Sequence, residues 1–107
     1  VLYKAKRYSD SLFFGHIVLE KILKAHVVRN TKKQAPYLHD LIRLQELGDV
    51  DLTSKEVLLL NKINDFNIRS RYPEYKLAFY MTCTKKYAKE YIDQIIVLYE
   101  KVCQMLK

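Results

Sequence analysis

The chain has 107 residues, of which 19 are Lys or Arg and 12 are Asp or Glu, so its formal net charge is +7. Only two glycines and two prolines occur, which is too little turn-forming material for the many hairpins of an all-β fold. No run of about 18 apolar residues and no signal-peptide core is present, so we expect one soluble, cytoplasmic, all-α domain over residues 1–107 with no membrane segment.

The first predicted helix spans about residues 2–28 and has one apolar face. That face carries Tyr8, Leu12, Gly15, His16, Leu19, Ile22, Leu23 and His26, and the opposite face carries Asp10, Glu20, Lys21 and Lys24. His16 and His26 are separated by nearly three helical turns, so they cannot share one metal ion within this helix. We therefore expect both to be core histidines, and we expect no metal site.

Three apolar residues of the same helix, Phe13, Ile17 and Val28, fall among its charged positions. A helix in a bundle needs only one apolar stripe, so these residues predict a second buried contact. The economical candidate is the interface of a homodimer.

The second predicted helix begins near Pro36 and ends at Gly48, after a basic connection over residues 29–35. Its apolar positions are Leu38, Leu41, Ile42, Leu44 and Leu47. Thr53 and Glu56 then form a capping-box pattern that predicts the start of a third helix. This helix carries Val57, Leu60, Ile63 and Phe66 inward, and Pro73 predicts its end near Arg71.

After Pro73, residues 75–81 predict a short helical turn, and Thr82 or Thr84 is the expected N-cap of the last helix. The inward positions predicted for that helix are Tyr91, Ile92, Ile95, Ile96, Leu98, Tyr99, Val102, Cys103 and Leu106. The predicted fold is an up-and-down bundle of four main helices with a short extra helical turn after Pro73. If Cys83 and Cys103 both lie along the last helix, they are about 30 Å apart and cannot pair.

The strongest cluster of candidate binding residues lies where the third helix ends: Arg69, Arg71, Tyr72, Tyr75 and Lys76. One interpretation is structural, because cations suit the negative end of a helix dipole and the tyrosines can pack on the bundle. The other is functional: Arg71 binds a phosphate, Arg69 and Lys76 add charge, and Tyr72 or Tyr75 stacks on a base. His39 is either a capping or packing residue or a group that faces Arg71.

Three motifs in this order resemble the HEPN family, small prokaryotic helical domains often found beside minimal nucleotidyltransferases. They are Glu20 to Ala25 (EKILKA), His39-Asp40-Leu41, and the string FNIRSRYPEY at residues 66–75. The resemblance covers most of the chain. It implies a helical partner of a minimal nucleotidyltransferase, in some cases within a toxin and antitoxin module. We expect no cofactor.

In ribonuclease members of that family, the resemblance implies an arginine followed four to six residues later by a catalytic histidine. No histidine follows His39 here, so we expect no catalysis by the usual pair. An RNA-cleaving toxin that uses Arg71 with His39 is the alternative, and a purely structural helical module is a third. The resemblance also makes Tyr72 and Tyr75 candidate targets for adenylylation by the partner.

The positive charge is concentrated at the two ends of the chain. Residues 1–36 hold eight Lys or Arg against two acids, and residues 76–107 hold six against three, whereas residues 37–75 hold five against seven. If the terminal helices pack side by side, one face would attract RNA or a nucleotide. A solvated lysine-rich surface explains the same counts.

Overall fold

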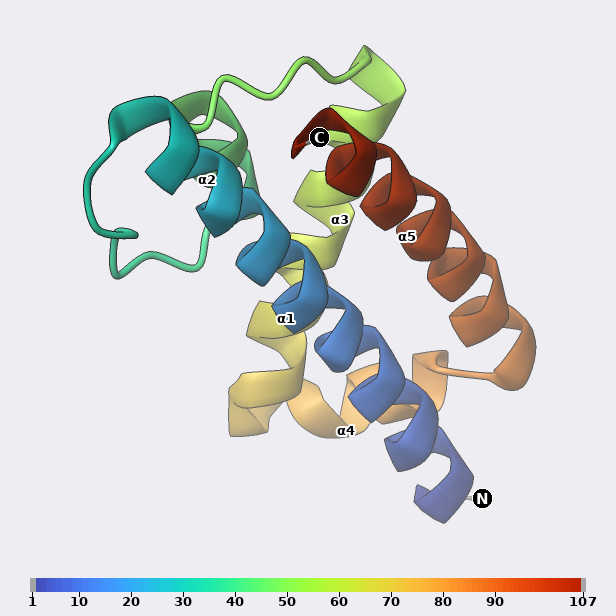
Figure 1. Cartoon of the computed structure of the whole chain (residues 1–107). Helices are drawn as coiled ribbons and strands as arrows, with labels where there is room; N and C mark the ends of the chain where they lie inside the picture. Colours follow the sequence, from blue (N-terminus) through green and yellow to red (C-terminus); the bar gives the residue numbers. More distant parts are fainter. Residues whose placement is uncertain (1, 107) are drawn as a thin grey trace.

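The first helix, α1 (Leu2–Thr31), is the centre of the fold, because it packs against each of the other four helices. The computed structural model describes residues 2–106, with side chains from residue 7 onward. In Figure 1, α1 crosses the front of the bundle and α5 (Lys85–Leu106) runs beside it in the same direction. α3 (Ser54–Arg71) lies behind α1 and runs the opposite way. The predicted all-α fold is confirmed, and the described residues contain no strand.

Two shorter helices complete the arrangement: α2 (Leu41–Leu47) and α4 (Pro73–Thr82). α2 contacts α1 and α3 near the end of α1, whereas α4 lies across the other end of α3. α4 has ten residues, so the segment after Pro73 is a full helix and not the single turn that was predicted. Pro73 occupies its first turn, where a missing backbone N–H costs nothing.

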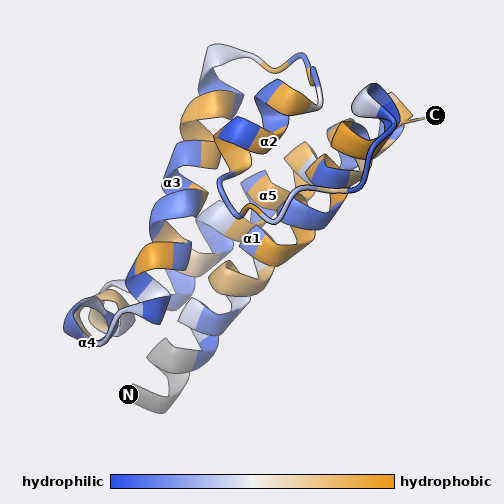
Figure 2. Ribbon diagram, turned by 90° about the vertical axis from the view of Figure 1, so that its left-hand side faces the viewer, coloured by the Kyte–Doolittle hydropathy of each residue, from blue (hydrophilic) through white to orange (hydrophobic). Residues whose placement is uncertain are grey.

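The core takes side chains from all five helices and is mostly aliphatic, with two phenylalanines. In Figure 2, hydrophobic and hydrophilic residues alternate along the helices, as expected for helices that each bury one face. The Phe66 ring lies 5.6 Å from the Phe79 ring and 5.1 Å from the Tyr91 ring, centre to centre. The fully buried members are Leu12, Leu19, Leu23, Leu41, Leu44, Leu60, Ile63, Phe66 and Phe79.

Hydrogen bonds from α1 to the far end of the chain hold α1 and α5 together. His26 Nε2 lies 2.8 Å from the carbonyl oxygen of Val102, and Arg29 donates to the carbonyl oxygen of Met105 at 2.8 Å. A carbonyl oxygen can only accept, so Nε2 of His26 carries the proton. The prediction that His26 is a core histidine agrees with its 6% exposure.

The capped starts of α3 and α5 were predicted correctly. Thr53 accepts a hydrogen bond from the Glu56 amide, and the Glu56 carboxylate accepts one from the Thr53 amide, which is the predicted capping box. Thr84, not Thr82, caps α5 by accepting from the amide of Tyr87. The Thr82 hydroxyl instead donates to the Ala78 carbonyl within α4.

Two other boundaries were predicted wrongly. α1 continues to Thr31, three residues beyond the predicted end, and Lys32 then adopts a left-handed φ of 59° that stops it. α2 begins at Leu41 and not near Pro36, because the Asp40 carboxylate accepts hydrogen bonds from the amides of Ile42 and Arg43. Residues 32–40 therefore form a loop that carries His39.

The helical wheel predicted the burial of two side chains wrongly. Ile96 was predicted to point inward but is 49% exposed. Glu20 was placed on the solvent face but is 7% exposed, because the loop before α2 covers it with His39.

The two cysteines are both free. Cys83 is buried and lies just after α4, so it is not on the last helix, while Cys103 is partly buried on α5. Burial raises the pKa of the Cys83 thiol to about 11, which makes it a poor nucleophile. Within residues 2–106, no helix is both long and apolar enough to cross a membrane.

Candidate functional site

A buried carboxylate organises the polar side of α1. Glu20 accepts a hydrogen bond from Lys24 Nζ at 3.0 Å through one oxygen, and its other oxygen lies 3.0 Å from Nδ1 of His39. Burial alone would raise the pKa of the Glu20 carboxyl, but the hydrogen bonds from Lys24 and His39 outweigh it and lower that pKa below 4.5. Glu20 is therefore ionised at neutral pH and compensates the charge of Lys24.

The Glu20 contact fixes how His39 presents its ring. A carboxylate can only accept, so Nδ1 of His39 carries a hydrogen and donates a hydrogen bond to Glu20. The tautomer that this contact selects has the other ring nitrogen, Nε2, as its acceptor. The His39 side chain remains 46% exposed, so this nitrogen is within reach of a ligand.

His16 also contributes to this site, through a hydrogen bond to the loop that carries His39. Its Nε2 donates to the backbone carbonyl of His39 at 3.0 Å, which ties the loop before α2 to α1. Burial lowers the pKa of His16 below 6.5, against the opposing effect of the nearby Glu20 charge. His16 is therefore neutral at pH 7 and acts as a structural hydrogen-bond donor.

Arg71 shares a pocket with His39. The pocket has a volume of about 330 Å³ and lies between α1, the loop before α2 and the end of α3. Its walls are Phe13, His16, Ile17, Glu20, Lys21, His39, Asn67 and Arg71. Lys21 and Arg71 are its positive side chains, and the only negative one, Glu20, is paired with Lys24. The pocket therefore favours an anion.

The end of α3 explains the position of Arg71. Tyr72 has an extended backbone before Pro73, and its amide donates to the Ile68 carbonyl as the final bond of the helix. Arg71 is the last residue of α3 and is exposed, so its guanidinium is available at the rim of the pocket. The predicted stop near Arg71 is confirmed.

The other predicted site residues lie outside this pocket. The Arg69 guanidinium sits 5.0 Å from the centre of the Phe79 ring and 3.9 Å from Asp65, which is a packing role. Tyr72 and Tyr75 are 50% and 49% exposed near the start of α4. Lys76 is partly buried on α4. None of these four residues is among those that line the pocket.

Sequence reasoning missed four residues that line the pocket: His16, Glu20, Lys21 and Asn67. Glu20 belongs to the EKILKA motif, but the helical wheel placed it on the solvent side. The signal that could have found it is the spacing of His16, Glu20 and Lys24 at four-residue intervals, which puts them on one stripe of α1. Asn67 is 8% exposed, and a buried amide beside an arginine is a cue for a polar site.

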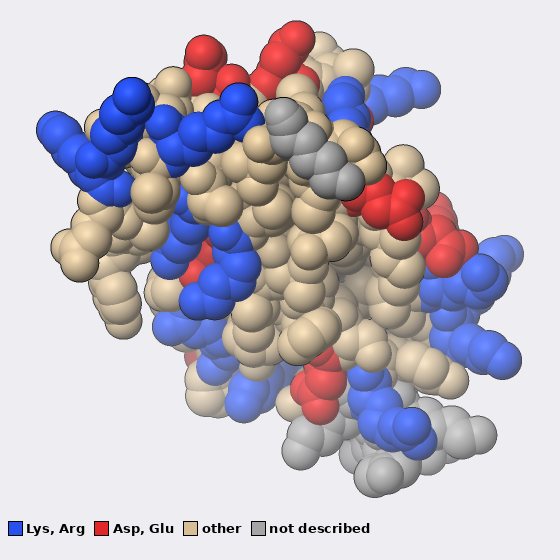
Figure 3. Space-filling model, viewed as in Figure 1, with Lys and Arg blue, Asp and Glu red and all other residues tan. Residues whose placement is uncertain are grey.

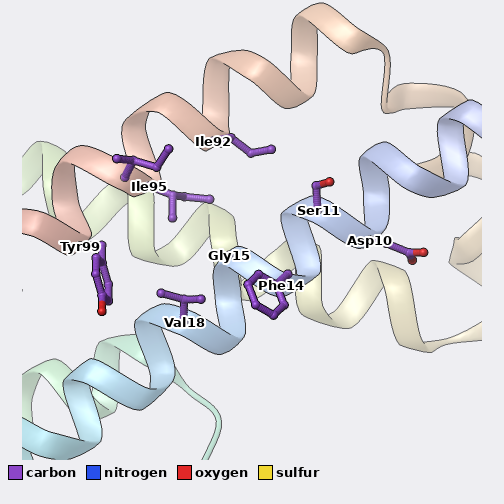
Figure 4. Close-up of a pocket in the computed structure, with 9 residues that line it drawn as sticks. Asp10, Ser11, Phe14, Gly15, Val18, Ile92, Ile95 and Tyr99 are labelled. Atoms are coloured by element: carbon purple, nitrogen blue, oxygen red, sulfur yellow. The ribbon is translucent and has the colours of Figure 1, made fainter.

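A second hollow, between α1 and α5, is apolar. Figure 4 shows Phe14 and Val18 of α1 and Ile95 and Tyr99 of α5 around the backbone of Gly15. A Cβ at Gly15 would lie 2.8 Å from Ile95 Cδ1, so glycine is what allows the two helices to approach here. Phe14 is 64% exposed at the edge of this groove. We call it the α1/α5 groove; it has a volume of about 470 Å³.

The α1/α5 groove continues toward the polar pocket. A shallower hollow lined by Phe14, Ile17 and Lys21 lies between them and shares residues with both. Phe13 and Ile17, two of the predicted dimer residues, are partly buried along this path, whereas Val28 is 41% exposed further along α1. Among the described residues, no group of three His, Cys, Asp or Glu side chains could hold a metal ion.

Nearly the whole chain matches a known protein family. The model of the family described as HEPN domain matches residues 1–106. No curated protein and no solved structure matches the chain.

Proposed function

The chain belongs to the HEPN domain family, and from this membership we propose that it is a nucleotide- or RNA-binding module whose polar pocket holds a phosphate. In this proposal the protein is a homodimer and the helical partner of a minimal nucleotidyltransferase, within a toxin and antitoxin module. The observation that carries the binding proposal is that His39 and Arg71, from distant parts of the chain, line one pocket with Lys21.

The chemistry of the pocket supports a phosphate ligand. An arginine guanidinium matches phosphate oxygens with two parallel hydrogen bonds, and Lys21 adds a second positive charge. Glu20 does not repel the ligand strongly, because Lys24 and His39 already hydrogen-bond to its two oxygens.

The surface charge supports the same proposal. Figure 3 shows Lys and Arg side chains gathered over the C-terminal part of α1 and the loop beyond it. Such a basic surface attracts polyanions, and this attraction weakens as the salt concentration rises.

Binding of a labelled single-stranded RNA, measured by fluorescence anisotropy, tests the pocket. We expect Arg71→Ala to weaken binding roughly tenfold or more, as for loss of a charged hydrogen bond. Arg43→Ala is the matched control, because Arg43 is an exposed arginine on α2 that does not line the pocket. Equal losses in both variants, or affinity that does not fall between about 50 and 200 mM salt, would contradict a phosphate site.

The partner proposal has its own test. Co-expression with the product of a neighbouring nucleotidyltransferase reading frame should yield a complex that survives size-exclusion chromatography.

Tyr72 and Tyr75 are half exposed, so adenylylation by that partner is sterically open to both. Intact mass before and after incubation with the partner and ATP would show it, and loss of the added mass in Tyr72→Phe or Tyr75→Phe would identify the residue.

A second candidate function is RNA cleavage, favoured by the His39 geometry. With Nδ1 bound to Glu20, Nε2 of His39 could take the proton of a ribose 2′-hydroxyl while Arg71 stabilises the charge on the phosphate. Incubation with tRNA and total RNA, beside Arg71→Ala and His39→Ala, tests it. If the wild type cleaves no better than these variants, the protein binds without cleaving.

A further inference from the structure

The loop before α2 carries the most exposed large apolar side chain of the described residues. Tyr37 is 97% exposed, so its ring buries almost nothing against the rest of the chain. It has one ring neighbour: the His39 ring, with centres 5.7 Å apart and planes at 64°. The phenol therefore stands free beside the histidine of the polar pocket.

The position of Tyr37 is nevertheless defined by the anchored residues on its C-terminal side. His39 is held at both its ring and its carbonyl, by Glu20 and His16. Asp40 then caps α2, and its carboxylate also accepts a hydrogen bond from the Asn64 side chain at 2.9 Å. These contacts anchor the C-terminal end of the loop on α1 and α3, so Tyr37 projects from a fixed base.

The surroundings of Tyr37 suit a nucleic acid strand. Lys32 and Lys33, in the same loop, are exposed, and His39, the ring neighbour of Tyr37, lines the pocket with Arg71. An exposed aromatic ring beside positive charge is the arrangement by which proteins bind unpaired bases and track the backbone.

We propose that Tyr37 is a stacking platform for one unpaired nucleobase, placed beside the phosphate pocket, and that the site therefore takes single-stranded RNA. This inference rests on the proposed function and specifies its ligand. A base inside a duplex is already stacked on both faces and cannot lie on the Tyr37 ring, whereas a base in a single strand can. The tyrosine supplies the surface for the base, and Arg71 supplies the contact to phosphate.

The test compares Tyr37→Ala, Tyr37→Phe and wild type, with a labelled single strand of about ten nucleotides and the same sequence as a blunt duplex. We expect Tyr37→Ala to weaken single-strand binding roughly five- to hundredfold, the range of one base–aromatic stack. Tyr37→Phe should keep the wild-type affinity, because the ring and not the hydroxyl makes the contact. Leu58→Ala is the control for loss of an exposed apolar side chain, since Leu58 is 67% exposed on α3.

A strand containing 2-aminopurine adds a readout that a structural role would not change. Stacking on the ring at position 37 should quench the fluorescence of the 2-aminopurine base with the wild type and with Tyr37→Phe, but not with Tyr37→Ala. The melting temperature of Tyr37→Ala should match that of the wild type, because the side chain is almost fully exposed.

The outcomes separate this inference from the proposed function. If Arg71→Ala loses binding while Tyr37→Ala keeps it, or if duplex binds as tightly as single strand, the platform is refuted and the phosphate pocket stands. If wild type binds neither RNA, the proposed function itself fails. Loss of binding in Tyr37→Ala with binding kept in Tyr37→Phe and Leu58→Ala supports the platform.

Discussion

The ionisation of Glu20 links the stability of the fold to pH. Its lowered pKa means that the folded state holds the carboxylate more tightly than the unfolded state does, so it stabilises the fold above pH 4.5. This contribution is lost as the pH falls through the folded-state pKa.

We predict that Glu20→Gln lowers the free energy of unfolding by about 1 kcal/mol at pH 7 and by less at pH 3, measured by urea denaturation. The control is Asp93→Asn, which removes the exposed pair between Lys89 and Asp93 and should change little. A Glu20→Gln effect that is the same at both pH values would contradict the assigned ionisation.

His16 adds a second pH dependence of the same sign. Its pKa is lowered in the folded state, so the unfolded state takes up the proton first and stability falls as the pH drops below 6.5. We predict that His16→Gln, whose amide can still donate to the His39 carbonyl, flattens this part of the curve. Thermal melts between pH 7 and pH 5 would measure it, and an unchanged slope would refute the neutral, buried state of His16.

At the scale of single residues, the sequence singled out His39 and Arg71, which line one pocket, but not Glu20, the α1 residue that contacts His39. A helical wheel assigns Glu20 to the solvent face from its angle alone, and it cannot account for a loop that folds over the helix. The burial of Glu20 depends on the placement of His39, nineteen residues away, and no local pattern encodes that. Arg69 was predicted as a site residue, but its guanidinium packs on the Phe79 ring, and this contact depends on the turn into α4.

Among the helices, those whose ends are set by local side-chain chemistry were the predictable ones. The capping box of Thr53 and the stop at Pro73 each involve residues within a few positions, so the sequence suffices. At α2, two signals competed, and the aspartate cap at Asp40 displaced the proline start at Pro36.

The capping box provides a prediction for α3. Thr53→Ala should cost about 1 kcal/mol of stability, because the Glu56 amide loses its acceptor at an exposed helix end. Ser54→Ala, one residue later, is the control, and we expect it to change stability by less than about 0.5 kcal/mol. Urea denaturation of both variants checks this, and equal effects would mean that the Thr53 hydroxyl does not cap the helix.

For the whole molecule, the prediction concerns the number of chains. The apolar surface that runs from the α1/α5 groove to Phe13 and Ile17 supports a second copy as its occupant, since exposed Phe14 and Ile96 flank a hollow continuous with the predicted seam. We predict that wild type sediments at twice the mass of the chain and that Phe14→Asp is a monomer with unchanged helicity by circular dichroism.

Val97→Asp is the matched control for the dimer, because Val97 is 68% exposed on α5 but does not line the α1/α5 groove. It should remain dimeric. A monomeric wild type over the whole accessible concentration range would rule out the homodimer, and the seam predicted at Phe13, Ile17 and Val28 with it.

The contacts of His26 with Val102 and of Arg29 with Met105 each join residues 76 positions apart. During synthesis, α1 emerges early, yet the helix that it packs along is made last. The part of α1 that packs along α5 must therefore wait until residues 98–106 have left the ribosome, even after α2, α3 and α4 have been made. Pairing with α5 is thus the last helix contact that α1 can complete during synthesis, and a nascent chain stalled before Leu98 should bind a holdase chaperone more than a chain that includes residues 98–106.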